Sequence, residues 1–552
     1  MSIVHEVRKH ILLSGRWMLL LGIFMVPLIV WGVLNSGQSG VWVRVIRLGT
    51  VSLMWFVLPL MWLRTRYCVW LFGLAIISVV AETGHLLVTS AFFNAGTMRS
   101  VLATNPGEAA ELMGSLLPFL PLIALIPVLY FLLVRHPLPD VSRSRFRWWL
   151  PLLPLMMLLA SEGVDYHRSG VSYRFGDNSI KALTQVPPAN IYFALGKAWS
   201  MERHIRQQQA GYRDFSYQAH SEKDTSVRQV CVVVIGESAR ADHFGLNGYA
   251  RNTTPRLSAR GDVISYEDFF TSANVTLYSI PLMLTRFGAD EFDRVHSEPS
   301  LVSAFHEAGF RTGWISNQGL MSDPHTAFIM DVDKLCDFPG YQNQIYDEVV
   351  LPCLREMLSS RAGRICVFVH LMGNHVAYNA RHPKEFEVFR PSLSDGSRAA
   401  VPANREYFVN SYDNSVLYQD YILSRIIGQV DSLPGENFVL YLADHGESLF
   451  DQGSQLFGHT GDPPVREQVH VPFLVWLSPE YRMGNPEQTA SLEGHRSAAL
   501  HMDDFFFTLL DMAGVRHRFE DPAKSFADSL YIPHDERRVV APSGRIVTFP
   551  HE

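Results

Sequence analysis

Residues 436–448 read ENFVLYLADHGES, a run of aromatic, leucine and valine residues that ends in an Asp-His pair. Three other stretches have the same form, an apolar run followed by polar residues: QVCVVVIGES (229–238), RTGWISNQ (311–318) and RICVFVHLMGNH (364–375). Short, continuously apolar runs are typical of strands buried on both faces of a parallel sheet. Helical patterns such as NSVLYQDYILSRIIGQV (414–430) lie between them. The alternation predicts an α/β sandwich, a mostly parallel sheet with helices on both faces.

The polar residues that follow these runs are candidate metal ligands. Glu237, His375 and the pair Asp444 and His445 follow three of the runs, and His459 lies in the loop beyond the last. Sites in such sheets form at the carboxyl ends of the strands. Carboxylate and imidazole ligands suit zinc, although manganese accepts the same donors. A lone Asp is usually a helix cap and a lone His a hydrogen-bonded loop residue, but the adjacent pair together with Glu237 favours a metal site.

A candidate nucleophile lies in FFTSANVTLYSIPLML (269–284). This segment places the hydroxyls of Thr271, Ser272, Thr276 and Ser279 around the start of an apolar helix. A metal near a hydroxyl oxygen stabilises its alkoxide, and a helix N-terminus favours an anionic phosphate. The alternative is a structural Ser/Thr N-cap.

Residues 1–164 contain five apolar runs long enough to cross about 30 Å of hydrocarbon. They are residues 17–34, 45–63, 67–89, 116–134 and 147–163. With the N-terminus in the cytoplasm, inner segments hold nine Lys/Arg residues and outer segments three, which follows the positive-inside rule. The odd number of spans then places the rest of the chain outside the cytoplasm, in the periplasm if the cell is Gram-negative.

We therefore divide the chain into a transmembrane domain of five helices (1–164), a linker with interfacial helices (165–226) and a periplasmic catalytic domain (227–552). The net charge changes from positive to negative after residue 164. Of 47 Lys+Arg and 54 Asp+Glu, residues 1–164 hold 12 and 6, which leaves 35 and 48 for the remainder. An acidic C-terminal part excludes a nucleic-acid partner, because binding phosphates requires clustered Lys/Arg.

Five motifs together resemble a known family. They are GESARADHFGLNGYARNTTP (236–255), TSANVTLYSIPLML (271–284), HLMGNHVAY (370–378), YDNSVLYQDYI (412–422) and YLADHGESLFDQG (441–453). In sequence and order they are similar to the membrane phosphoethanolamine transferases of Gram-negative bacteria, in the alkaline phosphatase and sulfatase superfamily. The resemblance implies an inner-membrane enzyme that moves phosphoethanolamine from phosphatidylethanolamine onto lipid A, lipopolysaccharide core or periplasmic glucan. The intermediate it implies is a covalent phospho-threonine.

The same resemblance implies a role for each of eight residues. The metal ligands would be Glu237, Thr276, Asp444 and His445, with Thr276 also the nucleophile; the substrate-binding residues would be His375, His459 and one or both of Asn317 and Gln318. The implied metal is zinc, one ion or two, with manganese as the alternative.

Three positions depart from the members that act on lipid A. Those members flank the threonine with a cysteine pair, where this chain has Ser272 and Leu282, and they carry a lysine in the stretch that here reads GLMSDP (319–324). These differences favour the branch that modifies core heptose or periplasmic glucan. Of the other cysteines, only Cys336 and Cys353 are placed to pair, and the sequence leaves their pairing open.

Other classes of protein remain as alternatives. A phosphoglycerol transferase, phosphodiesterase or sulfatase acting on envelope substrates would share the fold and metal, but the sulfatase motif C/S-x-P-x-R does not occur around Thr276. A serine hydrolase is disfavoured because GESAR and HGESL lack the second glycine of G-x-S-x-G, and Ser238 is expected to cap a helix. A membrane receptor that has lost catalysis would not need to retain Glu237, Thr276, Asp444 and His445 together.

Overall fold

The structure is a computed structural model with two compact units. It describes residues 2–34, 41–89, 116–136, 186–209, 212–224, 226–318, 326–338, 345–396 and 400–550, with a few isolated residues between these ranges. The N-terminal unit comprises Met1–Arg99 and Met113–Ser200, and the C-terminal unit comprises Ser100–Leu112 and Met201–Glu552.

The N-terminal unit is helical. Its helices are α1 (Ser2–Leu34), α2 (Val41–Trp62), α3 (Thr65–Thr89), α6 (Leu120–Val134) and the first part of α9 (Ala189–Gln209). Three segments are long and apolar enough to cross a membrane, namely Gly15–Leu34, Arg44–Trp62 and Thr65–Leu87. Helix α6 has only 15 residues, and the run predicted over 147–163 lies mostly outside the described residues. Apolar N-terminal helices are therefore confirmed, whereas a count of five spans stays a prediction.

Aromatic packing holds the first three helices together. The rings of Phe24, Phe56 and Phe72 form a cluster with centroid separations of 3.9 to 5.8 Å. Large apolar side chains on the outside, such as Trp62 and Trp70, are exposed. This pattern suits helices whose outer surface contacts lipid, because lipid tails are as apolar as the side chains.

A buried carboxylate fixes the start of α9 to α3. Glu82 accepts hydrogen bonds from the backbone N–H of Phe93 (2.9 Å) and from Nδ2 of Asn190 (2.5 Å). The hydroxyl of Tyr192, one half-turn further along α9, donates to the carbonyl of Leu74 (2.8 Å). Ionisable groups inside apolar helical units are costly unless they are paired, and Glu82 is satisfied by these two donors.

The C-terminal unit is built on a seven-stranded sheet with helices on both faces. The strands, in spatial order, are β3 (Val263–Tyr266), β11 (Phe473–Leu477), β8 (Phe438–Ala443), β2 (Gln229–Gly236), β7 (Arg364–His370), β5 (Arg311–Ser316) and β6 (Lys334–Asp337). Strands β8, β2, β7, β5 and β6 pair in parallel, whereas β11 is antiparallel to both neighbours. The predicted α/β fold is confirmed, and the sheet is mixed.

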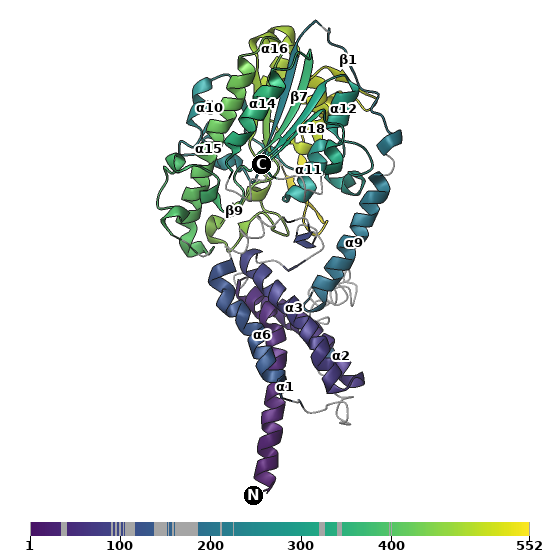
Figure 1. Ribbon diagram of the computed structural model, residues 1–552, viewed down its shortest axis with the longest axis vertical. Coiled ribbons are helices and arrows are strands. Elements are labelled where there is room, and N and C mark those ends of the chain that lie inside the picture. The colour runs from purple at the N-terminus through teal and green to yellow at the C-terminus, as the bar shows by residue number, and fades with distance from the viewer. Residues whose placement is uncertain are drawn as a thin grey trace. The chain divides into compact units, whose positions relative to one another are not determined.

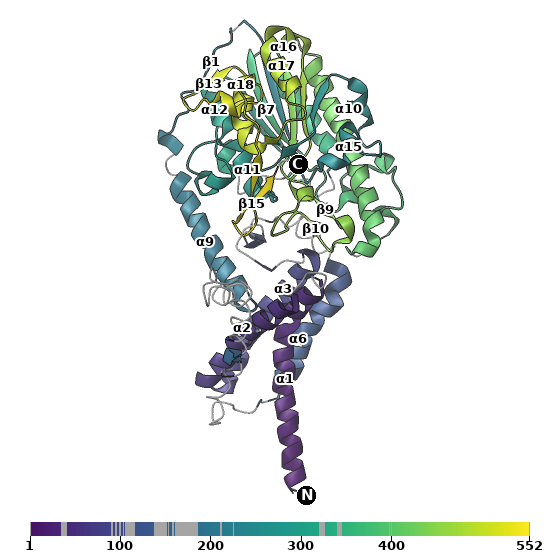
Figure 2. The same cartoon turned by 180° about the vertical axis from the view of Figure 1, so that it is seen from behind.

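Helices cover the two faces of this sheet (Figures 1 and 2). They are α10 (Pro255–Arg260), α11 (Thr276–Leu284), α12 (Leu301–Glu307), α14 (Val350–Leu358), α15 (Arg405–Asp431), α16 (Pro479–Gly484), α17 (Pro486–Gly494) and α18 (Phe505–Met512). Helices α14 and α15 lie against the face turned to the viewer in Figure 1, and α17 and α18 are seen on the other face in Figure 2. Every residue of β2 and β8 is buried because both faces are covered.

Short strand pairs complete the unit. They are β1 (His220–Ser221) with β13 (Val515–Arg516), β9 (Ser448–Leu449) with β10 (Phe457–Gly458), β4 (Phe269–Phe270) with β12 (Leu500–His501), and β14 (Glu536–Val540) with β15 (Ile546–Pro550).

The register of the central strands brings the polar strand ends together. Gly236 of β2 lies opposite Ala443 of β8, so Glu237 and Asp444 leave the sheet side by side. Ile235 of β2 pairs with His370 of β7, and His370 pairs with Ser316 of β5. The carboxyl ends of four parallel strands therefore meet at one edge, where open α/β sheets bind ligands.

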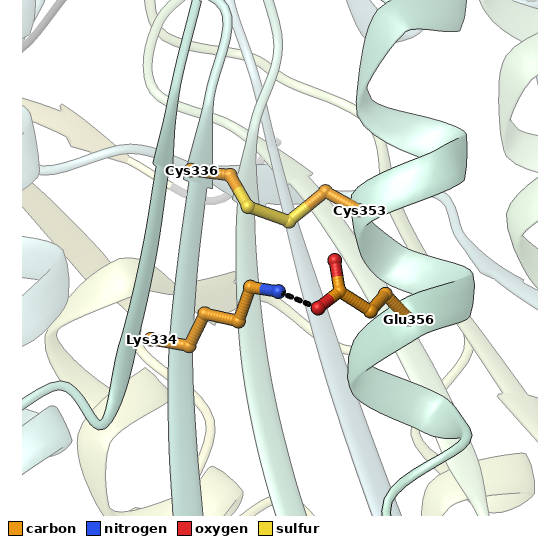
Figure 3. The surroundings of a disulfide bond; sticks show 4 residues. All are labelled: Lys334, Cys336, Cys353 and Glu356. Atoms are coloured by element: carbon orange, nitrogen blue, oxygen red, sulfur yellow. Dashed lines mark ion pairs between the residues drawn. A yellow bond between two sulfur atoms is a disulfide. The ribbon is translucent and has the colours of Figure 1, made fainter.

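Cys336 and Cys353 form a disulfide that joins edge strand β6 to α14, which settles the pairing that the sequence left open (Figure 3). Beside it, Nζ of Lys334 forms an ion pair with Glu356 of the same helix. Strand β6 is the last strand on this side of the sheet among the described residues. A covalent bond and an ion pair thus connect it to α14.

The double variant Cys336→Ser and Cys353→Ser should be less stable by about 3 kcal/mol, because the disulfide closes a loop across a sequence separation of 17 and restricts the unfolded chain. Thermal unfolding of the purified chain, with and without reductant, measures this. An equal midpoint for the variant and the oxidised wild type would show that the bond contributes nothing.

Candidate metal centre and active site

Four side chains converge at the carboxyl edge of the sheet. Nε2 of His445 lies 3.1 Å from Oγ1 of Thr276, 3.3 Å from Oε1 of Glu237 and 3.4 Å from Oδ2 of Asp444. Oγ1 of Thr276 is also 3.3 Å from Oε2 of Glu237. Glu237, Asp444 and His445 each offer one ligand atom, these atoms lie within 4.8 Å of one another, and all three residues are buried. Two carboxylates and an imidazole so arranged suit a divalent cation.

The tautomer of His445 leaves its metal-binding nitrogen free. Nδ1 lies 2.9 Å from the carbonyl oxygen of Gly446. A carbonyl only accepts, so Nδ1 carries the proton and Nε2 presents its lone pair to the cluster. Orientation of a ligating imidazole by a hydrogen bond to its other nitrogen is usual in metal sites.

Asp444 is oriented in a comparable way. Its Oδ1 accepts the backbone N–H groups of His445 (2.8 Å) and Ser238 (3.2 Å). Its Oδ2 is buried and accepts no hydrogen bond from the described residues. A buried carboxylate oxygen without a donor is costly unless a cation satisfies it, so the cluster fits a bound metal.

The two carboxyl groups have opposite pKa shifts. Burial and the neighbouring charge of Glu237 raise the pKa of Asp444 well above its usual value. Burial would also raise the pKa of Glu237, but the electrostatic effect of the His445, His375 and His459 imidazoles and the hydrogen bond from Gln318 outweigh it and lower that pKa. Without metal, therefore, the pair favours one charge and one proton, and a divalent cation would take the place of that proton.

Thr276 presents its hydroxyl to the cluster rather than to its own helix. It is the first residue of α11, the N-cap is Val275, and no side chain caps this end. The alternative interpretation of Thr276 as a structural N-cap is therefore not supported. The neighbouring hydroxyls are engaged elsewhere: Thr271 donates to the carbonyl of Asp444 (2.6 Å), and Ser272 donates to Asp503 (2.6 Å).

Both predicted histidines lie at this edge of the sheet. The ring of His459 is 4.1 Å from that of His445 between centroids, and its Nδ1 is 3.4 Å from Oε2 of Glu447. His375 is buried, and burial lowers its pKa to about 3, although the charge of Glu237 partly offsets this. The imidazole of His375 is therefore neutral at neutral pH.

The structure distinguishes Asn317 from Gln318. Nε2 of Gln318 donates to Oε2 of Glu237 (3.0 Å) and to the carbonyl of Leu371 (2.9 Å). Nδ2 of Asn317 instead donates to Oδ1 of Asp347 (2.9 Å) and to the carbonyl of Ile345 (3.1 Å). Gln318 is the member of this pair that lies at the candidate site.

Several residues at the site were not found from the sequence. Ser238, expected to cap a helix, donates its hydroxyl to Oε1 of Glu237 (2.7 Å) and has a left-handed backbone with φ 54°. Asp347 accepts the backbone N–H groups of Met372 (2.8 Å) and Gly373 (2.9 Å) and so shapes the loop before His375. The only sequence signal for Ser238 was its place in GES, directly after the predicted ligand.

A family model described as Sulfatase matches residues 229–515, just over half of the chain, and this range contains all four converging residues. The chain belongs to the sulfatase family.

Within this family the chain is similar to named transferases. It is 27% identical over 412 residues to phosphoethanolamine transferase EptA of Salmonella typhimurium, covering 72% of this chain and 73% of that protein. It is 30% identical over 310 residues to phosphoethanolamine transferase EptC of Escherichia coli, covering 53% of this chain and 52% of that one.

Solved structures show the same fold. The C-terminal periplasmic domain of EcEptC from Escherichia coli, in complex with Zn, aligns with a TM-score of 0.54 at 26% identity, over 60% of this chain and 94% of that one. The integral membrane lipooligosaccharide phosphoethanolamine transferase A (EptA) of Neisseria meningitidis aligns with a TM-score of 0.71 over 89% of this chain and 92% of that one. At 21% identity the second comparison shows the fold alone.

Proposed function

We propose that this sulfatase-family chain is a zinc-dependent phosphoethanolamine transferase that uses Thr276 as a covalent nucleophile. The observation that carries the proposal is the position of Thr276 Oγ1, 3.1 Å from Nε2 of His445 and 3.3 Å from Oε2 of Glu237, at the N-terminus of α11. The similarity to EptA and EptC supports the transferred group, and the Zn complex of the EcEptC domain supports the metal.

Glu237, Thr276, Asp444 and His445 would hold one zinc ion, which when bound lowers the pKa of the Thr276 hydroxyl and withdraws charge from the phosphoryl oxygens. In the first half-reaction Oγ1 of Thr276 attacks the phosphorus of phosphatidylethanolamine. The bond from phosphorus to the diacylglycerol oxygen breaks, and phosphoethanolamine stays on Thr276. The proton of the threonine hydroxyl ends on the diacylglycerol oxygen, so the leaving group departs as an alcohol.

His459 is the residue that we assign to this proton transfer. Its Nδ1 faces the carboxylate of Glu447 at 3.4 Å, which favours the tautomer with the proton on Nδ1 and leaves Nε2 to carry the transferred proton. His375, neutral because of its burial, would donate a hydrogen bond to the phosphoryl group. In the second half-reaction an acceptor hydroxyl gives its proton to His459 and attacks the phosphorus. The bond from phosphorus to Oγ1 of Thr276 breaks, and His459 returns the proton to Oγ1, so the threonine hydroxyl is restored.

The proposed donor is a lipid, which agrees with the helices of the N-terminal unit. Three candidate spans anchor the chain in a membrane, where phosphatidylethanolamine is concentrated. We place the protein in the bacterial inner membrane, with its N-terminus in the cytoplasm and residues 227–552 in the periplasm. The acceptor would be an envelope glycan or glycolipid. Since Ser272 and Leu282 replace a cysteine pair, we favour lipopolysaccharide core or periplasmic glucan over lipid A.

Donor trapping tests the proposed intermediate. The purified chain, incubated in detergent with phosphatidylethanolamine and no acceptor, should gain one phosphoethanolamine group, located on Thr276 by peptide mass spectrometry. Release of one equivalent of diacylglycerol should accompany it. A group found on Ser238, Ser272 or Ser279, or release of diacylglycerol only when an acceptor is present, would contradict the two-step mechanism.

The acceptor can be identified independently of the mechanism. Mass spectrometry of envelope lipids and glycans from cells with and without the gene should show one class of molecule that loses a phosphoethanolamine group when the gene is absent. Loss from lipid A alone would contradict the acceptor class proposed above.

A further inference from the structure

The turn that follows Glu237 is held in an unfavourable backbone conformation. Ser238 is fully buried and has φ 54°, a left-handed value that residues with a Cβ rarely adopt. Such a residue costs free energy and persists only when its surroundings hold it, and these positions cluster at functional sites. Here the turn directs both the side chain and the backbone N–H of Ser238 to the candidate ligands. The hydroxyl donates to Glu237 (2.7 Å), and the N–H donates to Asp444 (3.2 Å).

A tyrosine from a distant helix closes this turn. The hydroxyl of Tyr412, on α15, donates to the carbonyl oxygen of Ser238 (2.7 Å) and accepts the backbone N–H of Arg240 (2.9 Å). One phenol oxygen therefore satisfies two backbone groups on either side of residue 239. Tyr412 is buried, and the rings of His243 and Tyr378 pack edge-on against it, each with centroids 5.2 Å away.

The loop after β7 contacts the backbone of Glu237, while the side chain of Gln318 donates to its carboxylate (3.0 Å). Asn374 donates its backbone N–H to the carbonyl of Glu237 (2.9 Å). Gly373 has φ 52°, and a Cβ there would lie 2.9 Å from the backbone of Glu237, so only glycine permits this approach. Glu237 is thus fixed on one side by the loop after β7 and on the other by the turn that Tyr412 holds.

We infer that Tyr412 is a positioning residue for the metal ligand Glu237: its hydroxyl holds the left-handed turn at Ser238, and the turn sets where the Glu237 carboxylate lies. This inference rests on the proposed zinc site. It accounts for one of the polar residues that the motif YDNSVLYQDYI places among the buried residues of α15. Within the described part of the chain, Tyr412 forms no hydrogen bond to Thr276 or to the candidate metal ligands, and it acts through the backbone of Ser238 and Arg240.

The test is the zinc affinity of the Tyr412→Phe variant of the full-length chain, measured by competition with a zinc chelator. Loss of a direct partner of a metal ligand typically lowers metal affinity by about 10- to 100-fold. Tyr412 acts one residue further from the metal, so we expect the lower end of this range, a loss of about tenfold. Phosphoethanolamine transfer by the variant at low zinc should fall in parallel and should recover when zinc is raised. A purely structural role would lower the amount of folded protein without this recovery.

Tyr481→Phe is the matched control. Tyr481 is equally buried, its hydroxyl lies 3.0 Å from the carbonyl of Met512, and its ring packs on Phe438 at the start of β8, the end of the sheet away from the site. It should bind zinc as the wild type does. Unchanged zinc affinity in Tyr412→Phe, or an equal loss in Tyr481→Phe, would overturn the inference.

The proposed function can fail separately. If the wild type binds zinc, Tyr412→Phe weakens that binding, and no phosphoethanolamine is transferred, then Tyr412 positions the ligand in an enzyme of another activity. If the wild type transfers phosphoethanolamine and Tyr412→Phe binds zinc normally, the positioning role is wrong and the function stands.

Discussion

Thr276→Val should reduce phosphoethanolamine transfer on the order of 10⁴-fold, the scale on which loss of a covalent nucleophile acts. Valine keeps the shape and β-branching of threonine and removes only the hydroxyl. In the structure that hydroxyl caps nothing and contacts Glu237, His445 and Asp444 of the cluster. The free energy of unfolding should therefore change by less than about 1 kcal/mol. Transfer from a labelled donor, followed together with thermal unfolding, separates the two effects.

Two variants control this experiment. Thr276→Ser keeps an oxygen near the same place and should keep measurable transfer and the covalent adduct. Ser279→Ala removes a buried hydroxyl from the same helix that has no hydrogen-bond partner among the described residues, and it should transfer at the wild-type rate. Transfer by Thr276→Val above a tenth of the wild-type rate would remove Thr276 from the mechanism.

The strands that carry the candidate site could be predicted because their continuously apolar sequences are typical of buried strands. A run such as VCVVVI contains no polar side chain that could face solvent, which predicts a strand buried on both faces. The structure agrees, because every residue of β2 is buried. The direction of a strand in the sheet, by contrast, could not be predicted from its sequence. The run FLVWL of β11 is as apolar as its neighbour β8, and nothing in its composition shows that it runs antiparallel. The direction of a strand is decided by how the chain returns to the sheet.

The candidate ligand residues could also be predicted from the sequence, but the residues that orient them by hydrogen bonds could not. Glu237 and the pair Asp444 and His445 follow predicted strands, and parallel register alone brings them together. The orientation of these side chains depends on contacts that are distant in sequence. Tyr412 bonds the carbonyl of Ser238 across 174 positions, and Asn317 donates to Asp347. Local patterns carry no information about such contacts.

Hydropathy has a comparable limit in the N-terminal unit. It locates apolar runs and does not show how much of each run is helical. The run predicted over 116–134 begins with three residues of 3₁₀ helix at Leu117–Phe119, and the α-helix that follows has 15 residues. Prolines explain the break, because each removes a backbone donor and Pro118 lies in the 3₁₀ segment.

The second large effect concerns the metal. Asp444→Asn should lower zinc affinity by at least about 100-fold, because it replaces the buried Oδ2, which accepts no hydrogen bond from the described residues, with a neutral amide. Oδ1 would still accept the N–H groups of His445 and Ser238. The geometry around the substitution is thus maintained while the charge is lost. Metal analysis of purified chains should show about one equivalent of zinc in the wild type and a small fraction of that in the variant.

Asp420→Asn is the control for loss of a buried carboxylate as such. Asp420 lies on α15, is fully buried and accepts the backbone N–H groups of Arg256 (3.0 Å) and Leu257 (2.9 Å), at the start of α10 rather than at the cluster. Its variant should be less stable yet bind zinc normally. Full zinc content in Asp444→Asn would place the metal elsewhere. If Asp444→Asn lost zinc but kept transfer, Thr276 would need no metal to attack phosphorus, and the proton on its hydroxyl would have to leave through His459 or His445 alone.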